Sequence, residues 1–244
     1  MSIVVISGTG TGVGKTVVTA ALAALARARG ESVAVVKPAQ TGLPAGAPGD
    51  LADVTRLAGI TDTHELARFA DPLSPEAAAR VAGLPPLDLA AAAETVRGLA
   101  TARQHVLVEG AGGLLVRYDP AGATIADLAL ALGAPVLVVA APGLGTLNHT
   151  ALTLEALAAR QITLAGLVLG SWPENPGIAH RNNLTDLEVL SPGRLAGAIE
   201  QGAGMLSRPA FLSVARAGLA ATFGGRFDRA VFRETNGWQK ERVQ

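Results

Sequence analysis

The stretch Ile3-Val4-Val5-Ile6-Ser7-Gly8-Thr9-Gly10-Thr11-Gly12-Val13-Gly14-Lys15-Thr16 joins a short apolar run to a glycine-rich loop. The apolar run is rich in β-branched residues, which is typical of a buried strand in a parallel sheet. After the loop, Val18, Leu22 and Leu25 recur on one helical face, so we expect a helix that ends at Gly30. A glycine-rich loop that follows a strand and runs through Gly-Lys-Thr into a helix predicts a phosphate-binding P-loop.

The loop is a variant of the strict P-loop pattern, which requires glycine where Thr9 stands; the nearest glycine, Gly8, comes one residue earlier. In a P-loop the backbone N–H groups surround the phosphates, the lysine reaches the terminal phosphates, and the threonine hydroxyl binds Mg²⁺. Lys15 and Thr16 are expected to act in this way. The alternative is a strand-to-helix turn without a ligand, which leaves the Gly-Lys-Thr sequence at the helix start unexplained.

Strand-like and helix-like segments alternate along the rest of the chain. Strands are expected at residues 32–36, 105–108, 135–140 and 165–169, and helices near 50–57, from 75 onward, at 88–101, near 123–132 and near 150–160. This alternation predicts an α/β fold of the P-loop NTPase type, with a mostly parallel sheet covered by helices on both faces. We expect a single domain over residues 1–244, with a core at 1–170 and a less regular part at 171–244 whose tail, from Phe223, forms a docked helix.

Composition excludes several classes of protein. The 244 residues carry 20 acidic and 20 basic side chains, so the formal net charge is zero, and 49% of the residues are hydrophobic. Such a chain can bury a sizeable core, and the absence of a basic run argues against nucleic acid as a partner. No apolar run reaches the ~18 residues of a membrane span, and no leader pattern follows Met1, so we expect a cytoplasmic protein without a membrane partner. Without cysteine, disulfides, thiolate catalysis, zinc–thiolate sites and iron–sulfur clusters are excluded.

Lysine is scarce in this chain, because only Lys15, Lys37 and Lys240 are lysines among the 20 basic residues. Lys37 ends the second expected strand, at the carboxyl edge where open α/β sheets bind ligands. With Lys15 it would place two cations beside the phosphates, and we expect it to act on the transferring group rather than to stabilise the fold. A solvated surface lysine is the alternative, which the scarcity of lysine disfavours. Thr41 and Gly42 follow in a loop.

An acidic residue, Glu109, ends the apolar strand that begins at His105, and the small residues Gly110-Ala111-Gly112-Gly113 follow it. In P-loop proteins a carboxylate at such a strand end holds the metal ion, and the glycines let the backbone approach a ligand. The alternative is an ordinary turn after a buried strand. Asp50 is either a second metal ligand or the N-cap of the helix that follows, and the sequence does not choose between these roles.

A second loop with the features of an anion site runs from Pro142 to Thr150, after a strand and before a helix. Its backbone N–H groups and the helix N-terminus would attract an anion. A helix capped by Asn148, with no ligand, is the rival interpretation.

Taken together, these motifs resemble the dethiobiotin synthetase family. The resemblance rests on Gly8–Thr16, Lys37-Pro38 with Gln40-Thr41-Gly42, Asp50, Val108–Gly113 and Gly143–His149, which occur in the family's order over about the first 170 residues. It implies an ATP- and Mg²⁺-dependent ligase of biotin biosynthesis that acts as a homodimer. Its reaction would join CO₂ to 7,8-diaminononanoate and close the ring of dethiobiotin, through a carbamate and a carbamic–phosphoric anhydride.

The resemblance also implies roles for individual residues. The catalytic residues would be Lys37, Lys15 and Thr11, and the metal ligands Thr16, Asp50 and Glu109. The substrate would contact Lys37 and Thr41, and its carboxylate would reach Gly145, Thr146, Leu147 and Asn148 across the dimer interface. The nucleotide would be bound by Gly12, Val13, Gly14, Lys15, Thr16, Val17, Asp50, Glu109, Gly110, Ala111, Gly112, Gly170, Ser171, Glu200, Gln201 and Gly202.

The chain departs from the family pattern at three of these positions. Gly12 replaces a glutamate, Gly170 replaces an asparagine that reads adenine, and Glu200 replaces a proline. Without the asparagine, ATP is the expected nucleotide but other nucleoside triphosphates are expected to serve as well. Two other P-loop classes fit the sequence less well. A partition ATPase would carry a signature lysine where Gly10 stands, and an amidotransferase-like ligase would need a cysteine nucleophile, which the chain lacks.

Overall fold

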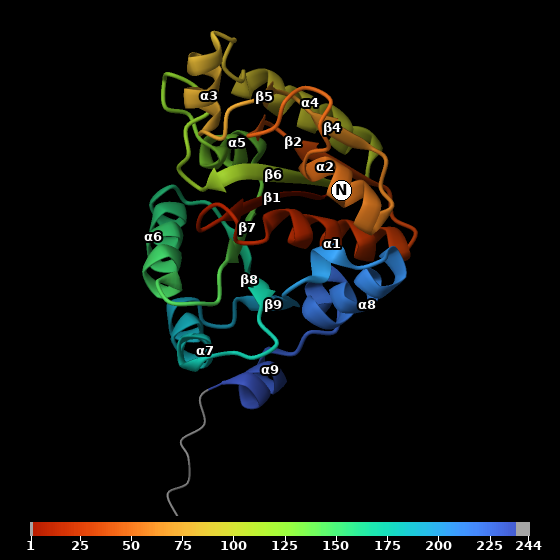
Figure 1. The fold of residues 1–244 in the computed structure, drawn as a ribbon, viewed down its shortest axis with the longest axis vertical. Helices are drawn as coiled ribbons and strands as arrows, with labels where there is room; N and C mark the ends of the chain where they lie inside the picture. The colour runs from red at the N-terminus through yellow and green to blue at the C-terminus, as the bar shows by residue number, and fades with distance from the viewer. Residues whose placement is uncertain (1, 238–244) are drawn as a thin grey trace, which may run out of the picture.

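The computed structural model describes residues 2–237, whose strands form one parallel sheet of seven strands and a smaller sheet of two (Figure 1). The order in the large sheet is β4-β2-β6-β1-β7-β8-β9, and each strand pairs in parallel with its neighbours. The strands of the large sheet are β1 (Ser2–Gly8), β2 (Val33–Lys37), β4 (Thr63–Glu65), β6 (His105–Gly113), β7 (Val136–Ala140), β8 (Leu164–Trp172) and β9 (Leu195–Glu200). The small sheet pairs β3 (Gln40–Thr41) with β5 (Arg68–Phe69).

Helices cover both faces of the large sheet. They are α1 (Lys15–Ala28), α2 (Asp50–Ala58), α3 (Pro75–Ala82), α4 (Leu89–Ala102), α5 (Ile125–Leu132), α6 (Thr146–Ala159), α7 (Ile178–Leu190), α8 (Arg208–Gly218) and α9 (Arg229–Asn236), with short 3₁₀ turns η1 (Ala203–Met205) and η2 (Ala221–Phe223). Buried side chains of α1, α2 and α8 form one core with one face of the strands, and those of α3 to α7 form a second core with the other face. Figure 1 shows α1 and α8 on one side of the strands and α6 and α7 on the other.

The two cores follow from the side-chain period of the strands. In β7, Val136, Val138 and Ala140 enter the core beneath α5, whereas Leu137 and Val139 enter the core beneath α1. A strand buried on both faces must be apolar at every position, which is why these strands are continuous apolar runs without polar alternation. The predicted α/β fold with a parallel sheet and helices on both faces is thereby confirmed.

The C-terminal part is more regular than the sequence predicts. Residues 171–237 include α7, β9, α8 and α9, and β9 is an edge strand of the main sheet. The expected docked helix after Phe223 is confirmed as α9, where Phe232 meets the ring of Trp172 edge-on at a centroid distance of 5.1 Å. The short strands β3, β4 and β5 were not predicted, because two or three residues carry no periodicity. Lys240 lies outside the described residues.

The predicted start of α2 near residue 50 is confirmed, but the cap role left open for Asp50 is wrong, and so is the predicted start of α6. The N-cap of α2 is Gly49, and Asp50 is the first residue of the helix, so Asp50 is not the cap. Helix α6 begins at Thr146 rather than near 150, with Gly145 as its N-cap, so Asn148 lies inside the first turn and does not cap the helix. The helices expected from 75 onward and at 88–101 are confirmed as α3 and α4, and the Asp88 side chain caps α4 by accepting a hydrogen bond from the Ala91 N–H.

Candidate active site

The parallel pairing of β1, β2 and β6 brings the carboxyl ends of these strands, with the predicted site residues, together. Strand β6 lies between β1 and β2, with Ile6 opposite Glu109 and Val36 opposite Val108. Lys37, the residue after Val36, therefore ends its strand beside Glu109, and the P-loop continues from β1 next to both. The predicted site at the carboxyl edge of the sheet thus follows from strand order.

At this edge, four side chains form one cluster. The Lys37 ammonium lies 2.8 Å from Glu109 Oε1 and also pairs with Asp50 Oδ2. Thr16 Oγ1 donates a hydrogen bond of 2.9 Å to the same Glu109 oxygen. Lys37 is 3% exposed and Glu109 is fully buried, so Lys37 is not the solvated surface lysine of the alternative interpretation. The structure brings the predicted metal ligands Thr16, Asp50 and Glu109 around one lysine.

The two lysines of the site have opposite pKa shifts. Burial alone would lower the pKa of Lys37, but the carboxylates of Glu109 and Asp50 outweigh burial and raise it above its usual value. The pKa of Lys15 is lowered to about 8, first by burial and then by the positive charge of Lys37. The Lys15 ammonium donates a hydrogen bond of 2.9 Å to the Gly10 carbonyl within its own loop. Lys37 is therefore firmly charged, whereas Lys15 loses its proton as the pH rises through about 8.

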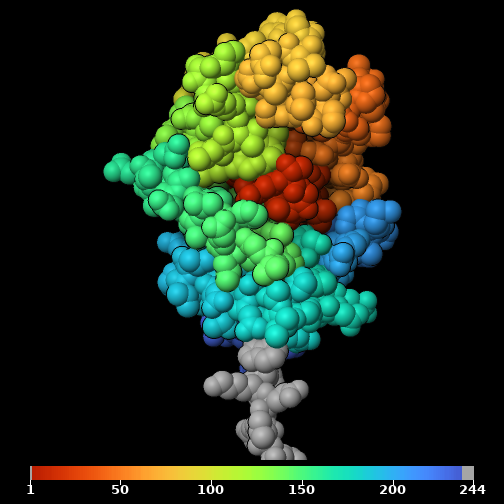
Figure 2. Space-filling view, turned by 60° about the vertical axis from the view of Figure 1, so that its left-hand side comes forward, coloured from red at the N-terminus to blue at the C-terminus, as the bar shows by residue number. Residues whose placement is uncertain are grey.

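A cavity of 790 Å³ opens above this cluster. Figure 2 shows the P-loop region, in red, at the surface between the yellow-orange segment around α3 and the green segments after it. The residues that line the cavity are Thr11, Gly12, Gly14, Lys15, Thr16, Val17, Lys37, Ala39, Gln40, Thr41, Gly42, Asp50, Pro72, Leu73, Ser74, Pro75, Glu109, Ala111, Gly112 and Val116. The cavity therefore has a charged floor at the P-loop and an apolar wall of Pro72, Leu73 and Val116.

The oxygen ligands of the cluster fit a magnesium ion. Glu109 Oε2 is buried and has no hydrogen-bond partner, so this carboxylate keeps one free oxygen beside Thr16. Mg²⁺ is usually held by one or two carboxylates together with phosphates and water. Residues 2–237 contain no group of three or more Asp, Glu, His or Cys that could hold a metal, so the two carboxylates and Thr16 would depend on a nucleotide for further ligands.

Gly170 lies behind the P-loop, where its backbone touches the loop directly. A Cβ atom at Gly170 would lie 2.0 Å from the Val13 carbonyl oxygen, and a Cβ at Gly14 would lie 2.5 Å from the Gly170 carbonyl oxygen. Gly14 has a φ of 97°, a conformation that also favours glycine. Neither position has room for a side chain, so no side chain at residue 170 reads a base in this structure.

Several predicted residues lie away from the cavity lining. Val13 and Gly110 are buried beside it, Gly170 and Ser171 lie near the end of β8, and Glu200, Gln201 and Gly202 are exposed at the end of β9. Gly145, Thr146, Leu147 and Asn148 form the start of α6 and do not line the cavity. The structure of the chain therefore does not bring the second predicted anion site to the P-loop cavity.

Two residues near the cluster received no role from the sequence. Gln40 is 5% exposed, lines the cavity and accepts a hydrogen bond from the Asp50 N–H. Tyr118 is buried, and its hydroxyl accepts a hydrogen bond of 2.7 Å from the Ala111 N–H of the glycine-rich loop. Tyr118 is the single tyrosine of the chain, and this rarity is the one feature by which the sequence could have indicated it. Gln40 belongs to the Gln-Thr-Gly motif, but its hydrogen-bond partner, Asp50, lies ten residues later and beyond a loop.

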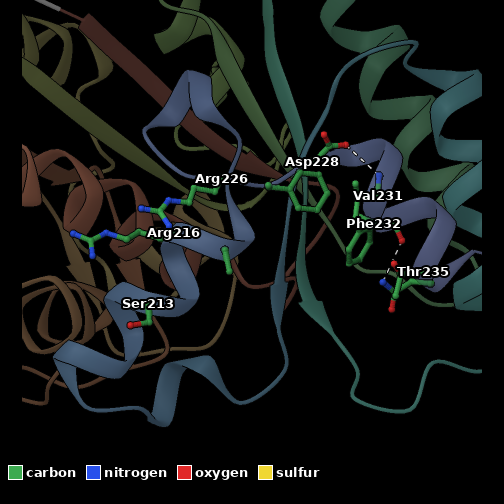
Figure 3. A pocket seen from close by; sticks show the side chains of 10 residues that line it. Ser213, Arg216, Arg226, Asp228, Val231, Phe232 and Thr235 are labelled. Atoms are coloured by element: carbon green, nitrogen blue, oxygen red, sulfur yellow. Dashed lines mark hydrogen bonds between the residues drawn. The ribbon is translucent and has the colours of Figure 1, made fainter.

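A second cavity, of 590 Å³, lies between α8 and α9 (Figure 3). Arg216 and Arg226 line one side of it and Phe232 the other. None of the predicted site residues lines this second cavity. No helix of residues 2–237 has the length and apolar character to cross a membrane. The P-loop cavity is therefore the candidate active site.

Comparison with known proteins identifies the family. The model of the family described as "AAA domain" matches residues 3–205. ATP-dependent dethiobiotin synthetase of Parafrankia sp. (strain EAN1pec) is 60% identical over 96% of this chain and 98% of its own length. The Rhodococcus jostii (strain RHA1) enzyme of the same name is 58% identical over 86% of this chain and 91% of its own length.

Among solved structures, the cell division ATPase MinD of Pyrococcus furiosus matches with a TM-score of 0.56 and 19% identity, over 88% of this chain and 96% of its own. MinD of Pyrococcus horikoshii, complexed with Mg-ADP, matches with a TM-score of 0.55 and 16% identity, over 95% of this chain and 92% of its own. At such low identity these likenesses show the P-loop NTPase fold alone. The sequence relatives are far closer, and the chain belongs to the family of ATP-dependent dethiobiotin synthetases, which are ligases.

Proposed function

We propose that this protein joins CO₂ to 7,8-diaminononanoate and closes the cyclic urea of dethiobiotin at the expense of ATP. One amine takes up CO₂ and loses a proton to give a carbamate. A carbamate oxygen then attacks the γ-phosphorus of ATP, which releases ADP and leaves a carbamic–phosphoric anhydride. The second amine attacks the carbonyl carbon, inorganic phosphate departs with the bridging oxygen, and the amine loses its proton as the ring closes.

The observation that carries this proposal is the Lys37–Glu109–Asp50–Thr16 cluster at the floor of the P-loop cavity. Phosphoryl transfer requires positioning and neutralisation of charge rather than an enzyme nucleophile. Lys15 would hold the terminal phosphates, and Lys37 would stabilise the carbamate and the transferring group, with Thr11 at the loop above them. Because the two carboxylates keep Lys37 charged, its ammonium suits an anionic reaction centre.

Mg²⁺ would be held by Thr16, Asp50 and Glu109 and would supply charge neutralisation for the phosphates. Asp50 would serve in this role as a ligand, since Gly49 rather than Asp50 caps the helix. The rest of the nucleotide would extend from Gly12, Gly14 and Val17 toward Ser171 and the exposed residues Glu200–Gly202. ATP is the proposed nucleotide, with other nucleoside triphosphates as substitutes.

The diamine would lie along the apolar wall of Pro72, Leu73 and Val116, with Thr41 near its reacting end. Its carboxylate would bind at Gly145–Asn148 of a second subunit, which makes the proposed enzyme a homodimer. Two exposed apolar side chains near the start of α6 support a subunit interface there, Leu144 at 93% and Leu152 at 58% exposure. Light scattering of the purified protein is expected to give twice the chain mass of 24.6 kDa.

Bicarbonate-dependent product formation tests the proposed activity. The purified protein, incubated with 7,8-diaminononanoate, ATP, Mg²⁺ and bicarbonate, is expected to form dethiobiotin and ADP in equal amounts. Omission of either bicarbonate or the diamine should abolish both products. ATP hydrolysis that continues unchanged without the diamine would contradict the proposal and would instead describe an uncoupled nucleotide hydrolase.

A further inference from the structure

Gln40 connects the small sheet to the start of α2. The side chain is 5% exposed and belongs to the two-residue strand β3. Its Oε1 accepts a hydrogen bond of 3.0 Å from the Asp50 N–H, and its Nε2 donates one of 3.1 Å to the Thr41 carbonyl. Both ends of the amide are thus engaged, which fixes its orientation.

Helix α2 depends on this amide for its first turn. The N-cap residue, Gly49, has no side chain, and the structure gives this helix no side-chain cap from its own sequence. The first N–H groups of a helix need acceptors from outside the helix, and Gln40 supplies one for Asp50. A Cβ atom at Gly49 would lie 2.7 Å from Gln40 Oε1, so glycine at this position leaves the room that the amide occupies.

The loop before α2 has a second anchor from the same small sheet. Gln40 pairs in register with Arg68, and the Arg68 guanidinium donates a hydrogen bond of 2.8 Å to the Ala47 carbonyl. The same guanidinium donates two hydrogen bonds, of 2.6 and 2.7 Å, to the two carboxylate oxygens of Glu65. The small sheet therefore fixes the backbone of the loop on both sides of Gly49.

Asp50 needs such support because its carboxylate is not buried. Its side chain is 33% exposed, whereas its partner Lys37 is 3% exposed. Packing alone does not hold an exposed carboxylate in one place, so the position of the Asp50 backbone decides where its oxygens lie. A shift at the start of α2 would move the carboxylate away from Lys37.

We propose that Gln40 is a positioning residue that holds Asp50 against Lys37 and within the metal site. This inference rests on the proposed function, in which Asp50 is a metal ligand. Groups that orient metal ligands commonly contribute about 10–100-fold to metal affinity. We therefore expect Gln40 to act through metal binding, not through contact with the diamine.

The test is Mn²⁺ binding, measured from the electron paramagnetic resonance signal of the free ion, with a non-hydrolysable ATP analogue present. Gln40→Met removes the acceptor at similar side-chain length and is expected to weaken Mn²⁺ binding about 10–100-fold. Gly49→Ala leaves Gln40 in the chain but displaces its amide, and should weaken binding in the same direction. Alanine can adopt the extended backbone of Gly49, with φ −104° and ψ −169°, without strain.

Asp88→Ala is the matched control, because it removes the N-cap bond to Ala91 at the start of α4, which does not line the P-loop cavity. This variant should lose thermal stability while binding Mn²⁺ like the unmodified protein. If Gln40→Met and Gly49→Ala fold and also bind Mn²⁺ normally, while Asp50→Asn binds it weakly, the positioning role of Gln40 is wrong and the metal site stands. If Asp50→Asn itself binds Mn²⁺ normally, Asp50 is not a ligand, and the positioning inference is overturned together with that part of the proposed function.

Discussion

Inside the P-loop cavity, Lys37 is 3% exposed and its ammonium lies 2.8 Å from the fully buried carboxylate of Glu109. The sequence predicts a lysine that acts on the transferring group and leaves the fold unaffected. The structure changes the second part of this expectation. Removal of one partner of a buried ion pair leaves an uncompensated charge, which typically costs about 3–5 kcal/mol.

Lys37→Met is therefore expected to lower the free energy of unfolding by about 3–5 kcal/mol and kcat by about 10²–10³-fold. Urea unfolding and steady-state kinetics measure the two effects. The double variant Lys37→Met/Glu109→Gln should recover part of the stability, because it removes the unpaired charge of Glu109. It should recover none of the activity. A Lys37→Met protein within about 0.5 kcal/mol of the unmodified stability would contradict the importance of the buried pair.

The lowered pKa of Lys15 should make nucleotide binding depend on pH. Its pKa is lowered to about 8, so in the free protein the side chain loses its proton as the pH rises through 8. A triphosphate favours the charged ammonium, so binding above this pH must take up a proton, and affinity should fall by up to about tenfold for each further pH unit. Below pH 8 the affinity should be nearly constant.

Calorimetry from pH 7 to pH 10, in buffers of different ionisation enthalpy, measures both the affinity and the proton uptake. Lys15→Arg is the comparison variant, since a guanidinium stays charged throughout this range. Its affinity is expected to be lower overall but independent of pH. An unmodified protein whose affinity for ATP is flat across the whole range would contradict the assignment of a lowered pKa to Lys15.

At the scale of elements, the contact between β8 and the P-loop makes residue 170 sensitive to size. Gly170→Ala would place a Cβ 2.0 Å from the Val13 carbonyl oxygen, so the loop must shift. We expect a loss of about 1–3 kcal/mol of stability and weaker ATP binding, measured by thermal unfolding and calorimetry. Gly98→Ala, in α4 with no atom within 4 Å of the added Cβ, should leave ATP binding unchanged. Equal ATP affinity in the two variants would show that the contact does not shape the loop.

The same contact supports weak discrimination between bases. Selective sites leave buried polar groups unpaired when the wrong ligand binds, which requires groups placed to hydrogen-bond the base. Residue 170 offers no side chain for this, and the P-loop and metal would bind the triphosphate common to all nucleotides. CTP, GTP and UTP are expected to support turnover within about tenfold of ATP, or about 1.4 kcal/mol. Kinetics with four nucleotides test this, and a preference for ATP above about 100-fold would mean that another residue reads adenine.

Elements with a local signal were predictable, and those that depend on distant partners were not. A few neighbouring residues are enough to predict strand β7, from its apolar run, and the P-loop, from its Gly-Lys-Thr sequence. The hydrogen bond that anchors the start of α2 gives no such signal, because its acceptor is Gln40, ten residues earlier in the small sheet. The sequence therefore leaves Asp50 as either a cap or a metal ligand, while in the structure its carboxylate pairs with Lys37.

At the scale of the whole molecule, strand order assembles the candidate site. Thr16 and Glu109 are 93 residues apart in sequence, and they meet because β1 and β6 are parallel neighbours. The sequence could predict that both residues lie at the carboxyl edge of the sheet, but not which strands are adjacent. The start of α6 lies at the same edge without lining the cavity, since it follows β7, which β1 separates from β6 in the strand order.

In the proposed reaction, a carbamate oxygen attacks the γ-phosphorus of ATP in the P-loop cavity. Bicarbonate labelled with ¹⁸O traces this oxygen directly, when products are analysed by mass spectrometry before the label exchanges with water. We expect each phosphate released to carry one oxygen from the labelled carbon dioxide, and the urea carbonyl of dethiobiotin to carry the other. Phosphate without label, formed together with dethiobiotin, would mean that water rather than the carbamate attacks ATP, and the proposed reaction would be wrong.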